Sequence, residues 1–100
     1  MFLLEKYADY IDTKTIISGG QYYYNHQMED INWIEKNKLT AKAHGTETYD
    51  VSLTIENDHL IDHQCTCPIE QKTICKHKTA LIIHLQEERF QDILAKGTTP

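Results

Sequence analysis

The sequence predicts an α+β fold in which N-terminal helices precede a small antiparallel β-meander of three to four strands, and a C-terminal helix follows a cysteine-rich segment. Two changes of hydrophobic period carry this prediction. Apolar residues recur first at helical spacing, then alternate with polar residues, then return to helical spacing. The cysteine-rich segment lies at the second change. With 100 residues, of which 40% are apolar and 25% charged, the chain is predicted to form a single domain over 1–100.

Residues 1–26 are predicted to be a helical lead-in. The stretch 14–26 contains Gly19 and Gly20, and two glycines within a helix cost about 2 kcal/mol relative to alanine. We therefore expect either a break or a close packing contact at this pair. Before it, a short helix over 2–12 is predicted from one apolar stripe at helical spacing, formed by Leu4, Tyr7, Ala8 and Ile11.

Residues 28–64 are predicted to form the β-meander, because apolar and polar residues alternate there with a period of two. Trp33 falls on this pattern and is assigned to the core of the sheet. Successive strands joined by short connections pair in antiparallel fashion. The predicted connections are rich in residues that suit turns, namely Lys36-Asn37-Lys38, Gly45 and Asn57-Asp58.

Residues 75–94 are predicted to be the C-terminal helix, with Thr73 as a candidate N-terminal cap. Gly97 suits the end of a helix, and residues 97–100 resemble the start of a linker. We therefore expect the chain to be one piece of a longer protein.

Composition argues against several classes of function. The formal net charge is −5 and the chain has a single arginine, which suits a nucleic-acid binder poorly because phosphate neutralisation needs basic side chains. No apolar run approaches the roughly 20 residues of a membrane span, and the N-terminus lacks the order of a secretory signal. We expect a cytoplasmic protein with reduced thiols and no membrane partner.

The segment 65–77 carries the strongest chemical signal. It contains the pairs Cys65-Thr66-Cys67 and Cys75-Lys76-His77, separated by seven residues. Three thiolates and one imidazole make a complete tetrahedral zinc set. Alternate residues of an extended chain face the same side, and seven residues suffice for a loop to bring the second pair back. The sequence therefore predicts a zinc knuckle.

Other interpretations of the cysteines are a Cys65–Cys67 disulfide, three ordinary buried thiols, and a catalytic nucleophile. A disulfide there closes a very small ring and leaves Cys75 unpaired, and we find no separate base for a nucleophile. His63 is an alternative ligand, but the set is complete without it, and His84, seven residues after His77, is a candidate to pack near the site. Both are predicted to have no metal role. Since four protein ligands leave no open position, the zinc is predicted to be structural, and the chain is predicted not to be an enzyme and to have no small-molecule substrate.

The Cys-x-Cys pair, the short spacer and the Cys-x-His pair resemble the SWIM zinc finger family. Pro68 directly after the first pair is also similar to the family. The likeness covers roughly residues 16–85, whereas Lys78 stands where the family usually has an apolar residue. Weaker similarities are the apolar run Ala80–Ile83, Gly20 before Tyr22-Tyr23, and His44-Gly45 before Tyr49–Leu53.

The resemblance implies a short sheet followed by a helix around zinc, with ligands at Cys65, Cys67, Cys75 and His77. SWIM domains occur in the N-terminal part of bacterial Swi/Snf-type helicase-like ATPases, and the family is thought to bind DNA or proteins. The chain is therefore similar to an accessory DNA-binding domain of a larger helicase-like DNA translocase.

Two kinds of partner follow from the residues. Lys72, Lys76 and Lys78 surround the predicted start of the last helix, where anions are favoured, so we expect weak, salt-sensitive contacts with DNA phosphates. Zinc with three thiolates carries a charge of about −1, which offsets part of this attraction. The alternative is a protein–protein interaction module with no direct nucleic-acid contact, using apolar residues near either end of the chain.

Overall fold

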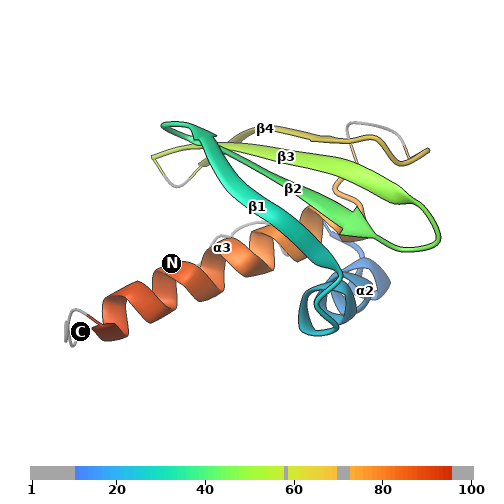
Figure 1. Cartoon of the computed structure of the whole chain (residues 1–100), viewed down its shortest axis with the longest axis horizontal. Helices are drawn as coiled ribbons and strands as arrows, with labels where there is room; N and C mark the ends of the chain where they lie inside the picture. The colour runs from blue at the N-terminus through green and yellow to red at the C-terminus, as the bar shows by residue number, and fades with distance from the viewer. Residues whose placement is uncertain (1–10, 58, 70–72, 96–100) are drawn as a thin grey trace.

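The computed structural model describes residues 11–57, 59–69 and 73–95, with side chains described as far as residue 88. These residues form two helices and a four-stranded antiparallel sheet (Figure 1). The predicted helix over 2–12 and the predicted linker over 97–100 lie almost wholly outside the described residues. The elements in chain order are α2 (Thr13–Tyr24), β1 (Met28–Glu35), β2 (Lys38–His44), β3 (Thr48–Glu56), β4 (His59–Cys65) and α3 (Lys76–Ala95).

The four strands follow one another in the order β1-β2-β3-β4, each antiparallel to the next. This confirms the predicted meander, and each connection falls at predicted turn residues. Asn57 has a φ of 52°, a left-handed conformation that asparagine tolerates better than most residues. Leu39 pairs with Leu53 and Ala41 with Val51 across β2 and β3, so apolar side chains from neighbouring strands share one face.

The core lies between that face of the sheet and α3, which passes beneath the sheet in Figure 1. Alternation in β2 and β3 sends every second side chain to the helix side, and the residues between them stay at least partly exposed. Helix α3 begins within one residue of its predicted start. The buried apolar residues facing one another are Leu39, Ala41, Ala43, Val51, Leu53 and Ile55 from the sheet, and Ala80, Leu81, Ile82 and Leu85 from α3.

Helix α2 runs unbroken through Gly19 and Gly20 and packs against α3. A Cβ atom added at Gly19 would lie 2.7 Å from Cβ of Thr79 and 3.0 Å from the backbone oxygen of Lys76. Of the two outcomes expected at the double glycine, the structure shows the close packing contact, and the helix is not broken there. Gly20 faces open space, so only the first glycine is needed for this approach.

Trp33 is 46% exposed, so its assignment to the core is wrong. It pairs with the buried Leu39, but β1 is an edge strand. Helix α3 packs against β3 and β4, which lie toward the opposite edge of the sheet from β1. Between Glu29 and Asn32 the register of β1 shifts, and Asp30 within the shift has a φ of 51°. Position at the edge therefore outweighs the alternation that the sequence shows.

Candidate metal centre

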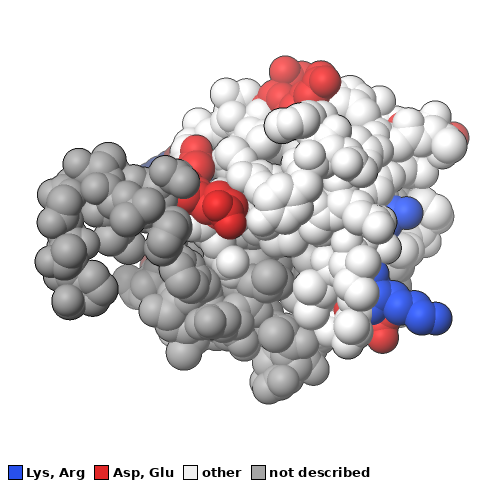
Figure 2. Space-filling model, turned by 90° about the horizontal axis from the view of Figure 1, so that it is seen from below, with Lys and Arg blue, Asp and Glu red and all other residues white. Residues whose placement is uncertain are grey.

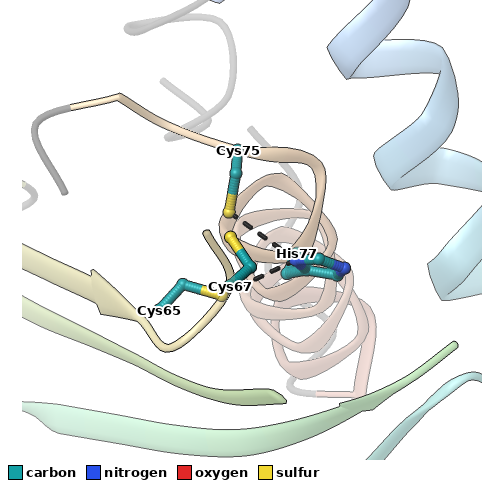
Figure 3. Close-up of side chains that lie close together, drawn as sticks. All are labelled: Cys65, Cys67, Cys75 and His77. Carbon is teal, nitrogen blue, oxygen red and sulfur yellow. Dashed lines mark hydrogen bonds between the residues drawn. The ribbon is translucent and has the colours of Figure 1, made fainter. Parts of the chain in front are cut away.

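The four ligand-type residues come from the end of the sheet and the beginning of α3. Cys65 is the last residue of β4 and Cys67 follows in the turn. Cys75 directly precedes α3, and His77 is the second residue of that helix. Figure 3 shows the three sulfur atoms and the imidazole ring gathered at one point. The two pairs thus lie side by side, as predicted.

The spacing of the ligand atoms suits a single tetrahedral ion. Nδ1 of His77 lies 3.6 Å from Sγ of Cys65 and 3.8 Å from Sγ of Cys75. All four ligand atoms lie within 4.8 Å of one another. Atoms bound at about 2.3 Å (sulfur) and about 2.0 Å (nitrogen) from a tetrahedral centre stand roughly 3.5–3.8 Å apart. The residues present therefore fit a metal bound by three sulfurs and Nδ1.

Two tyrosines fix the imidazole. The ring of Tyr22, from α2, meets the His77 ring edge to face at 5.0 Å, and the ring of Tyr49, from β3, lies 4.9 Å away at a tilt of 38°. Nδ1 of His77 faces the sulfurs, while Nε2 is buried and has no hydrogen-bond partner among the residues that the structure describes. The packing thus directs the ring nitrogen that can bind a metal toward the cysteines.

Backbone hydrogen bonds position both cysteine segments. Thr66 donates its N–H to the carbonyl of Asp50, and its hydroxyl accepts from the Asp50 N–H, which holds the Cys65–Cys67 turn against β3. At the other segment, the carbonyl of Cys75 accepts from the N–H and the hydroxyl of Thr79. Cys75 therefore occupies the position that caps α3, which places its side chain beside that of His77.

The Cys65 and Cys75 sulfurs share a hydrogen bond that shifts their pKa values in opposite directions. It lowers the pKa of Cys75 to about 3, with further lowering by hydrogen bonds from His77 and the backbone N–H of Lys78. The same bond, together with burial, raises the pKa of Cys65. The hydrogen bonds to Cys75 thus favour its thiolate form over its thiol form. A divalent cation bound by all three thiolates releases the remaining thiol protons, so metal affinity falls as pH falls.

The three lysines predicted to contact phosphates differ in their placement. Lys72 lies outside the described residues. Lys76 is half-buried, and its ammonium sits 5.4 Å from the centre of the Tyr22 ring. Lys78 is 1% exposed, so its prediction as a surface contact for nucleic acid is wrong. The reason is its place on α3, where it shares a stripe with Leu81, Ile82 and Leu85 that faces the core.

Sequence reasoning missed the residues that support the cluster. Nζ of Lys78 lies 2.9 Å from Nδ1 of His63 and donates to the carbonyl of Thr73 at 2.9 Å. Burial and the charge of Lys78 lower the pKa of His63. A lysine on an otherwise apolar helical stripe is the signal that could have identified this contact. His84 lies outside the cluster, 6.0 Å from the Tyr23 ring and 3.4 Å from Glu88.

Comparison of the chain with models of protein families, with curated proteins and with solved structures gives no match. In the described part of the chain, no helix has the length and apolar character to cross a membrane. The fold and the site therefore define an α+β chain with a buried cluster of three cysteines and one histidine, and the argument for function depends on that cluster.

Proposed function

We propose that the chain is a zinc-binding module in which a structural ion joins the sheet to α3. The observation that carries this proposal is the convergence of four buried ligand atoms within 4.8 Å of one another. Zinc is the metal that a Cys₃His set suits best among divalent ions, because it accepts thiolates readily and prefers four-coordinate tetrahedral sites. Four protein donors leave no open position, which supports a structural role.

The test is the metal content of the purified chain and of two histidine variants. Elemental analysis should give one zinc per chain, and His77→Ala should lose it because the fourth ligand is gone. His84→Ala is the matched control, since His84 lies on the same helix outside the cluster. It should retain zinc. A chain with no stoichiometric metal, or a His77→Ala variant with full metal content, would refute the proposal.

A protein partner is better supported than DNA as the target of this module. Lys78 is buried, and few described basic side chains are visible on the helix side of the molecule (Figure 2). Edge strand β1, by contrast, exposes the apolar residues Trp33 and Ile34, and the acidic residues Glu29 and Glu35 of the same strand are exposed as well. This surface suits a protein segment with apolar and basic side chains. The SWIM resemblance further supports an accessory role, in which the partner is the motor of a helicase-like translocase.

A gel shift and a binding assay with matched baits separate the two partners. With duplex DNA at low salt, we expect either no retardation or retardation that persists in the Lys72→Glu and Lys76→Glu variants. Retardation lost in these variants and at higher salt would assign the module to nucleic acid instead.

For the protein partner, the matched baits are Ile34→Glu and Ile17→Glu, because both isoleucines are 57% exposed but Ile17 lies on α2. A partner retained by the native bait should be lost with Ile34→Glu and kept with Ile17→Glu. Equal retention by both variants would exclude β1 as the contact surface.

A further inference from the structure

A pocket separate from the cysteine cluster lies where α2, β1 and α3 meet. Helix α2 packs against α3, and the chain passes from the end of α2 through a short turn into β1 (Figure 1). The pocket has a volume of about 420 Å³, which is enough for one long side chain. Its lining includes Tyr23 and Tyr24 from α2, Ile31 from β1, and His84 and Glu87 from α3.

Aromatic rings form steep walls of this pocket. The Tyr23 ring meets the Tyr24 ring at 76°, with 5.0 Å between their centres. It meets the His84 ring at 62°, with 6.0 Å between their centres. Rings at such angles do not stack flat on one another, and Tyr24 is 67% exposed, so ring surface remains to contact a bound group. The face of an aromatic ring attracts a cation that lies within about 6 Å of its centre.

Carboxylates give the pocket negative charge. Glu87 lines it, and Oε1 of Glu88 lies 3.4 Å from Nε2 of His84. Burial, followed by the charge of Glu87 and to a lesser extent that of Glu88, raises the pKa of Tyr23, so both carboxylates act on this ring. The described lining contains no lysine or arginine. A bound cation would therefore meet a carboxylate that no basic side chain of the described lining neutralises.

The end of α2 adds to this polarity. Tyr23 and Tyr24 are the last two residues of the helix, and its last turn contains no basic residue. The C-terminal end of a helix carries partial negative charge, which favours a cation placed beside it. Rings, carboxylate and helix end thus all favour a positively charged occupant.

We propose that this pocket receives a basic side chain, arginine or lysine, of the protein partner, held by the rings of Tyr23 and Tyr24 and by the carboxylate of Glu87. Ile31 of the lining lies two residues before the exposed Trp33, so one segment along β1 can contact both. The formal net charge of −5 also suits a basic partner. This inference rests on the proposed function, because it names what the proposed protein partner presents.

The first test uses a short peptide with one central arginine and the same peptide with citrulline in its place. Citrulline keeps the length and shape of arginine but is neutral. Each peptide is titrated into the isotope-labelled full chain, and the backbone amide signals are followed by NMR. The arginine peptide should shift the signals of Tyr24, Ile31 and His84, and the citrulline peptide should bind roughly tenfold more weakly. Equal binding of the two peptides, or no shift at these residues, overturns the inference.

The second test separates the contribution of the ring from that of the carboxylate. Tyr24→Leu should weaken binding of the arginine peptide severalfold, whereas Tyr24→Phe should keep it, because phenylalanine retains the ring face. Since Tyr24 is largely exposed, both variants should fold. Glu87→Gln should also weaken binding, and Glu56→Gln is its matched control, because Glu56 is exposed at the end of β3 and is not part of the described lining. Equal binding within either pair of variants overturns the inference.

Failure of the inference and failure of the proposed function give different results. A native chain without stoichiometric zinc refutes the proposed zinc-binding module, and equal retention of the partner by Ile34→Glu and Ile17→Glu excludes β1 as the contact surface. A native chain that holds zinc and depends on Ile34 for its partner, but binds the arginine and citrulline peptides equally, refutes only the role of the pocket.

Discussion

Burial does not follow polarity in two regions of the molecule, the junction of β4 with α3 and the edge strand β1. At the junction His77, Lys78 and Thr79 are buried, whereas β1 exposes Trp33 and Ile34. Polarity alone would predict the reverse. The difference shows that burial here follows the position of a residue in the layered fold and its closeness to the cluster of three cysteines and one histidine. A polar group can be buried where it has partners, and an apolar one stays exposed where no layer covers it.

Removing the proposed zinc should have the largest effect on this contrast, because the four residues at the junction would lose the ion that joins them. Structural zinc contributes an apparent ~10–16 kcal/mol near neutral pH, which exceeds the net stability of most small domains. We expect a chelator to abolish cooperative thermal unfolding and to lower helical circular dichroism, with recovery on adding zinc. An unchanged melting curve in excess chelator would show that the junction is stable on its own.

Truncating a core residue opposite the edge strand should come next. Leu39 is 1% exposed, so Leu39→Ala should reduce the free energy of unfolding by about 2–5 kcal/mol through lost burial and a cavity. Chemical denaturation of the zinc-loaded chain measures it. A cost below about 1 kcal/mol would mean that β2 contributes little to the core.

The two glycines of α2 should respond with opposite signs. Gly19→Ala places a methyl group 2.7 Å from Thr79 and should destabilise the fold by about 1–2 kcal/mol, since overpacking exceeds the gain in helix propensity. Gly20→Ala meets open space and should stabilise by up to about 1 kcal/mol. Melting temperatures of both variants give the comparison, and a shift of the same sign would disprove the close approach of α2 to α3.

Substituting an exposed residue of the edge strand β1 should have the smallest effect on stability. Trp33→Ala should alter the free energy of unfolding by less than about 1 kcal/mol, although its cross-strand neighbour is the buried Leu39. The fluorescence of Trp33, the only tryptophan of the chain, should be readily quenched by iodide. A protected tryptophan or a larger loss of stability would place Trp33 in the core after all.

The periodicity of the sequence was enough to predict the strands and α3. Alternation at Leu39, Ala41 and Ala43 and turn residues such as Asn57 set the meander, because a half-buried antiparallel strand has a period of two. The ligand set was also predictable, since Cys-x-Cys and Cys-x-His are local patterns. The exposure of Trp33 and the burial of Lys78 were not, because each depends on which element covers the residue.

The sequence by itself determined the order of elements, the two ligand pairs and the loop between them, all of which depend on neighbours along the chain. Only the tertiary structure decided that Tyr22 and Tyr49 flank His77, that Lys78 reaches His63, and that Gly19 meets Thr79. These contacts join residues far apart in sequence. Their geometry is set by how α2, α3 and the sheet pack together, which no local pattern specifies.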